Sequence, residues 1–96
     1  MIVKFDFGND MIQYISCSAK VGRKINKVAD EMINWFHDES KNKKYWIEDE
    51  DVGESIPNFA APEIVEWLNN VKFKKGRAKA KVIKSPYKEV GKTVYL

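Results

Sequence analysis

The sequence predicts a small α+β domain in which an antiparallel sheet packs against one long and one short helix. Segments near both ends of the 96-residue chain alternate between apolar and polar residues, as half-buried strands do. A central segment instead repeats its apolar residues with the period of an α-helix. The composition, 44% hydrophobic and 32% charged, is globular, and no linker-like tract divides the chain. We therefore expect residues 1–96 to form a single domain.

An N-terminal hairpin is the first predicted element. Residues 1–7 alternate in polarity, and residues 11–17 read as the returning strand. Between them, Gly8, Asn9 and Asp10 supply turn chemistry, because glycine and asparagine tolerate positive φ and aspartate hydrogen-bonds its own backbone. A three-residue connection that contains glycine fits a β-hairpin.

Two helices are predicted in the middle of the chain. The long one spans about residues 19–38, with Ser18 as its N-cap and Gly22 as a weak point costing up to about 1 kcal/mol relative to alanine. Its apolar stripe consists of Val21, Ile25, Val28, Met32, Trp35 and Phe36. The short helix spans about residues 62–71 and begins with Pro62, which suits a first helical turn.

The remaining segments are predicted from alternation and from turn residues. Residues 78–84 and 93–96 read as C-terminal strands that complete the sheet. Residues 48–60 resemble a long connection, and long irregular loops in compact domains are often functional. Residues 45–47 fit either a short strand or a loop anchor. The expected order is therefore strand, strand, helix, loop, helix, strand, strand.

The net charge of +3 hides an uneven distribution. Residues 1–27 carry a charge of +3, residues 28–70 carry −8, and residues 71–96 carry +8. We therefore expect one acidic and one basic region, unless folding interleaves them. Within the long helix the cations come first and the acids last, which opposes the helix dipole. This order fits a basic binding face or a chance arrangement of surface charges equally well.

No set of side chains with catalytic or metal-binding spacing is present. Cys17 and His37 flank the long helix, about 30 Å apart along its axis, so they are not expected to form a nucleophile–base pair. One cysteine and one histidine are too few for a usual zinc site, and residues 48–54 lack the glycine and glutamate spacing of a calcium loop. We expect no enzymatic activity, no metal and no cofactor.

The single cysteine also indicates the cellular compartment. A chain with one cysteine has no internal disulfide, and no apolar run approaches the length of a membrane span. We therefore expect a cytoplasmic protein without a membrane contact.

The first functional hypothesis is a regulator or inhibitor that binds a partner protein. An acidic run beside two aromatic residues resembles an interface anchor for a partner with a basic surface, such as one that normally holds nucleic acid. The predicted protein-binding residues are Tyr45, Trp46, Glu48, Asp49, Glu50 and Asp51.

The alternative hypothesis is direct and largely sequence-independent nucleic-acid binding by the lysine-rich C-terminal segment. The predicted residues are Lys72, Lys74, Lys75, Arg77, Lys79, Lys81 and Lys84. Lysines with interleaved aromatic residues suit single strands, whose bases stack while the phosphates pair with ammonium groups. Lysines on an exposed strand also protect a sheet edge from pairing, which is the competing explanation. The excess of lysine over arginine argues against sequence-specific reading.

Overall fold

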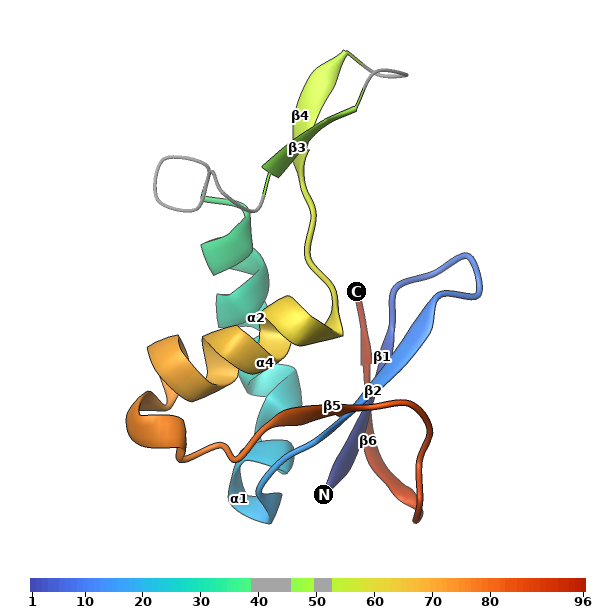
Figure 1. Ribbon diagram of the computed structural model, residues 1–96, viewed down its shortest axis with the longest axis vertical. Coiled ribbons are helices and arrows are strands. Elements are labelled where there is room, and N and C mark those ends of the chain that lie inside the picture. Colours follow the sequence, from blue (N-terminus) through green and yellow to red (C-terminus); the bar gives the residue numbers. More distant parts are fainter. Residues whose placement is uncertain (39–45, 50–52) are drawn as a thin grey trace.

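The computed structural model describes residues 1–38, 46–49 and 53–96 and shows an α+β fold (Figure 1). In chain order its elements are β1 (Ile2–Asp6), β2 (Ile12–Ser16), α1 (Ala19–Gly22), α2 (Ile25–Phe36), β3 (Trp46–Asp49), β4 (Glu54–Pro57), α4 (Ala61–Trp67), the π-helical turn η2 (Leu68–Lys72), the 3-10 turn η3 (Lys74–Gly76), β5 (Lys81–Ile83) and β6 (Val90–Tyr95). Four strands form the main sheet, and the helices pack on one side of it. Among the helices of this described part, none has the length and apolarity needed to cross a membrane.

The main sheet is mixed, with strand order β5-β2-β1-β6. β2 pairs antiparallel with both β1 and β5, but β6 lies parallel to β1, so the prediction of an antiparallel sheet is wrong at this strand. β5 and β6 stand at opposite edges, about 14 Å apart at the usual strand spacing, and therefore cannot pair as a hairpin. Residues 84–89 connect them, and a segment of this length reaches about 20 Å when extended, enough to cross the sheet.

The N-terminal hairpin is confirmed. Gly8, Asn9 and Asp10 all have positive φ, at 83°, 52° and 62°. The Met11 amide donates to the Gly8 carbonyl at 2.9 Å, and the Phe7 amide donates to the Met11 carbonyl at 2.9 Å. Local turn chemistry therefore sets the register of β1 against β2.

Both helix predictions need correction. The predicted long helix is divided into α1, capped by the Ser18 hydroxyl, and the 12-residue α2. Gly22 ends α1, and an alanine Cβ there would meet Cβ and Cγ of Met1 at 3.0 Å, so this glycine allows a close approach rather than only weakening the helix. The predicted short helix is α4, which continues as the π-helical turn η2.

The core lies between the helices and one face of the main sheet. Val3, Phe5 and Ile15 point from the strands toward the helices and are fully buried. From the helical side, Phe36 is also fully buried and stacks on Phe59, with ring centroids 4.4 Å apart. Since one such aromatic hides about 150–250 Å² from water, this layer holds much of the hydrophobic stabilisation.

Two side-chain amides join the helical layer to the strands and loops. The Gln13 Oε1 atom accepts a hydrogen bond from the Ala61 amide at 2.6 Å, which satisfies the start of α4. Asn69 donates to the Ala80 carbonyl at 2.9 Å and accepts from the Ala80 amide at 3.0 Å. These contacts fix the position of α4 and η2 against the segments that flank them.

A second, two-stranded sheet of β3 and β4 stands away from the main body (Figure 1). Residues 48–60 are therefore not an irregular connection throughout, because they include part of β3 and all of β4. The Trp46 indole N–H donates to the Phe36 carbonyl at 3.1 Å, which ties the start of β3 to the end of α2. Trp46 is thus both the first residue of a strand and an anchor.

Candidate functional site

Two basic segments that lie far apart in the sequence meet around Phe73. The π-helical turn η2 ends just before this residue, and the Phe73 amide donates to the Leu68 carbonyl at 3.0 Å. π-Helical turns of this kind occur frequently at functional sites. The half-buried Phe73 side chain packs against the hydrophobic core, next to the basic N-terminal part of the α1–α2 segment.

Phe73 lines three adjoining hollows with volumes of about 390, 250 and 380 Å³. The hollows share lining residues besides Phe73, namely Arg77, Lys24 and Lys72, so we treat them as one surface groove. We call this the Phe73 groove. Its cationic side chains are Lys20, Lys24, Lys27, Lys72, Lys74, Lys75 and Arg77. Among the residues that the structure describes, Glu31 is the one carboxylate that lines the groove.

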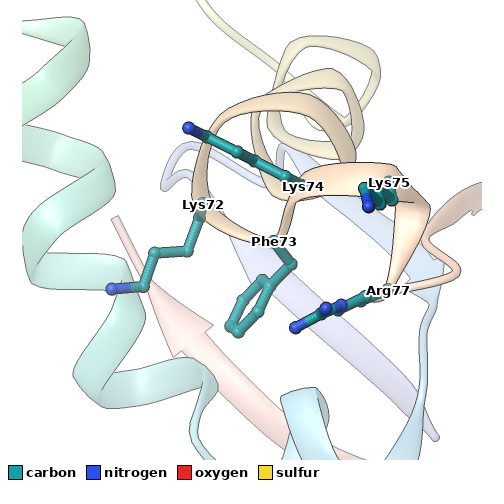
Figure 2. Close-up of a pocket in the computed structure, with 5 residues that line it drawn as sticks. All are labelled: Lys72, Phe73, Lys74, Lys75 and Arg77. Carbon is teal, nitrogen blue, oxygen red and sulfur yellow. The ribbon is translucent and has the colours of Figure 1, made fainter.

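The turn after Phe73 spreads the cationic side chains in different directions. Lys75 and Gly76 both have positive φ, at 66°, so the chain reverses tightly between Lys74 and Arg77. Figure 2 shows the Phe73 ring between the side chains of Lys72 and Arg77. The ring therefore forms an apolar floor bordered by positive charge.

One ion pair lies within the groove. The Lys72 ammonium group donates to both carboxylate oxygens of Glu31, at 2.7 and 2.9 Å. The Glu31 side chain is 57% exposed, and ion pairs this exposed contribute about 0–1 kcal/mol. A bound anion could therefore replace Glu31 as the partner of Lys72 at little energetic cost.

The predicted lysine-rich set is divided by the fold. Lys72, Lys74, Lys75 and Arg77 line the Phe73 groove, whereas Lys79, Lys81 and Lys84 do not. Lys81 begins the edge strand β5, and Lys84 directly follows that strand. These positions fit the edge protection considered from the sequence.

Three groove lysines were missed by the site prediction from sequence. Lys20, Lys24 and Lys27 belong to the α1–α2 segment, more than forty residues before the rest of the groove. The unfavourable order of charges along this segment was the one signal for them. In the fold these three lysines line the same hollows as Phe73, beside the cations of residues 72–77.

The acidic site predicted from the sequence lies largely outside the described residues. This applies to Tyr45, Glu50 and Asp51 altogether, and to the side chains of Glu48 and Asp49, whose backbone forms part of β3. Trp46 is described, and its indole is bound to the main body. The protein-binding role of this run stays a prediction.

Cys17 and His37 do not share a site. Burial raises the pKa of the Cys17 thiol, and the nearby N-terminal ammonium group opposes this shift only in part. His37 Nδ1 lies 2.8 Å from the Ile33 carbonyl at the end of α2. Within residues 1–38, 46–49 and 53–96, no three metal-binding side chains cluster.

No protein-family model, curated protein or solved structure matches this chain. The functional argument therefore depends on the Phe73 groove itself, on its charge and its shape.

Proposed function

We propose that this protein is a non-enzymatic nucleic-acid-binding protein that holds the phosphate backbone in the Phe73 groove. The observation that supports the proposal is that seven cationic side chains line one groove, against one carboxylate among the described residues. Such a surface attracts polyanions, because neutralising phosphates releases the counterions condensed on the nucleic acid.

The choice of cation indicates the kind of recognition. Six of the seven cationic side chains are lysines, and Arg77 is the one arginine. Lysine acts as a hydrated point charge, whereas the planar guanidinium of arginine is better suited to reading base edges. The groove therefore binds backbone with little sequence preference.

The test is the salt dependence of binding to a fluorescently labelled 15-nucleotide single strand, measured by anisotropy. Lys24→Gln and Lys27→Gln each remove one cation of the groove. If each lysine neutralises one phosphate, each substitution lowers the slope of log K against log salt by about 0.7 and weakens binding about 5-fold at 0.1 M salt. Lys92→Gln is the matched control, since Lys92 is exposed on β6 and does not line the groove.

A gain of affinity provides an independent check. Glu31→Gln removes the carboxylate that pairs with Lys72, so we expect tighter binding and a steeper salt dependence. The proposal is wrong if the wild-type protein does not bind, or if the groove variants and Lys92→Gln behave alike.

The β3–β4 hairpin supports a second candidate function, binding of a partner protein with a basic surface. This hairpin projects from the main body and carries the start of the acidic run (Figure 1). A labelled octa-lysine peptide serves as the probe. Binding should be lost on charge reversal by Glu48→Lys with Asp49→Lys but kept on Glu89→Lys, which changes an exposed acid elsewhere. Equal loss in both cases would exclude a role for the hairpin.

A further inference from the structure

The main sheet has a second face that none of the described helices covers. Along β1, Val3 and Phe5 point into the core, so Lys4 and Asp6 lie on the opposite face, which we call the open face. The pairing register places Tyr14 beside Lys4 on this face. The connection of residues 84–89 crosses it, and the Tyr87 hydroxyl lies 3.3 Å from the Ser16 hydroxyl.

Aromatic and aliphatic side chains are exposed along this face. Tyr14 lies between Lys4 and Ile83 in one row across the strands, and Asp6 lies between Ile12 and Tyr95 in the next row. Tyr95 is 77% exposed and Tyr87 is 65% exposed. A single exposed ring is common on protein surfaces, so the inference depends on two exposed tyrosines and several lysines lying on the same face of the sheet.

Positive charge is interleaved with these rings. Lys4 and Lys81 occupy open-face positions of β1 and β5, and the Lys88 ammonium group lies 5.8 Å from the centre of the Tyr87 ring. The Asp6 carboxylate on β1 accepts a hydrogen bond from the Gly8 amide at 2.9 Å and so already has a partner in its own turn. The face therefore presents rings and cations together.

We propose that the open face binds the unpaired bases of single-stranded nucleic acid, by stacking on Tyr95 and Tyr87 while nearby lysines contact phosphates. Every base has a flat apolar surface, so stacking on tyrosine is tolerant of sequence and requires that the bases be unpaired. Lys4 and Lys81 on this face, with Lys88 beside the Tyr87 ring, complement the phosphates of such a strand, whereas they would repel the same cations of a second copy of this basic chain.

This inference rests on the proposed function in one respect only, that the ligand is a nucleic acid. It uses different residues, and it specifies single strands, whereas the charge of the Phe73 groove also attracts duplexes. The two proposals can therefore fail separately.

The experiment compares a 15-nucleotide single strand with a duplex of the same length. Tyr95→Ala and Tyr87→Ala are each expected to weaken single-strand binding by about 5- to 100-fold, the range for loss of one base–aromatic stack. Duplex affinity should stay within twofold of wild type. Tyr95→Phe keeps the ring and should bind like wild type, whereas Tyr95→Leu keeps apolar area without a ring and should bind like Tyr95→Ala.

Two further measurements separate base stacking from self-association at the open face. A strand that contains bromodeoxyuridine should photo-cross-link to residues 87 and 95. Sedimentation velocity should show the same oligomeric state for wild type and Tyr95→Ala. Unchanged single-strand affinity in the tyrosine variants would overturn this inference even if Lys24→Gln still weakened binding. Loss of a wild-type dimer in Tyr95→Ala, with affinity unchanged, would assign the face to self-association instead.

Discussion

Replacing Gly22 by alanine tests two physical effects that have opposite signs. Alanine is the better helix former by about 1 kcal/mol in a helix interior, so propensity alone predicts a more stable protein. In the structure, however, an alanine Cβ would overlap the sulfur of Met1 and lie 3.0 Å from two of its carbon atoms. The Met1 side chain would have to withdraw from its half-buried position.

The cost of displacing Met1 outweighs the gain in helix propensity. Overpacking of this kind costs about 1–3 kcal/mol. Gly22 is the last residue of α1, so the gain in propensity is smaller than in a helix interior. We expect Gly22→Ala to lower the free energy of unfolding by about 1 kcal/mol, which lowers the Tm of a domain of this size by about 4–8 °C.

A second glycine, Gly91, tests whether displacement of Met1 causes the loss of stability. An alanine Cβ at this position of β6 would lie 2.7 Å from the Met1 Cγ atom, so both glycines contact the same side chain. Once one substitution has displaced Met1, the second should cost less. The double variant should therefore be more stable than the sum of the two single changes predicts, by about 0.5–3 kcal/mol.

The assay is urea unfolding followed by tryptophan fluorescence, with Asn26→Ala as the control. Asn26 is exposed on α2, so its replacement should change only helix propensity and raise stability slightly. If Gly22→Ala instead melts above wild type and adds independently to Gly91→Ala, the close approach of Met1 does not constrain the fold.

Three further changes test single contacts by the same unfolding assay. Gln13→Ala should cost about 1–2 kcal/mol because the Ala61 amide loses its acceptor, whereas Gln13→Glu keeps an acceptor and should stay near wild type; equal losses would refute this role. Asn69→Asp should cost about 1–3 kcal/mol at neutral pH, because a carboxylate cannot donate to the Ala80 carbonyl, and the deficit should shrink on acidification as the carboxyl group regains a proton. Burial raises the pKa of the Cys17 thiol, so the folded state favours the neutral thiol. The resulting contribution to the free energy of unfolding is complete below the pKa of this thiol in the unfolded chain, and it is lost as the pH rises through the pKa in the folded protein. As the pH rises past the thiol's ordinary value of 9.0, wild type should therefore lose stability more steeply than Cys17→Ala, and parallel pH profiles would contradict this.

The sequence predicts those parts of the fold that depend on residues close together in the chain. The turn at residues 8–10 fixes the hairpin by its own backbone preferences, and the prediction there is correct. The partner of β6 is determined by the path of residues 84–89 across the sheet, which no periodicity encodes, and here the prediction fails. Likewise, the contact between Met1 and Gly22 converts an apparent weak point into a packing requirement.

The candidate site could likewise be predicted only in the part that lies within one continuous segment. The run of cations at residues 72–77 is visible in the sequence, but its convergence with Lys20, Lys24 and Lys27 depends on the packing of Phe73 against the core. The reversed order of charges along the helical segment pointed to these lysines without showing what they face. Which lysines of a basic run act together is a tertiary property.

The parallel pairing of β1 with β6 also has a consequence for the order of folding. Ile2 lies beside Val90, so this ladder closes a loop of more than eighty residues, and its entropic cost is met only once the intervening chain is compact. During synthesis the apolar edge of β1 is made long before its parallel partner, and in that interval it is a template for pairing with other nascent chains. Pulse-labelling hydrogen exchange should accordingly find the amides of β6 protected after those of the β1–β2 hairpin.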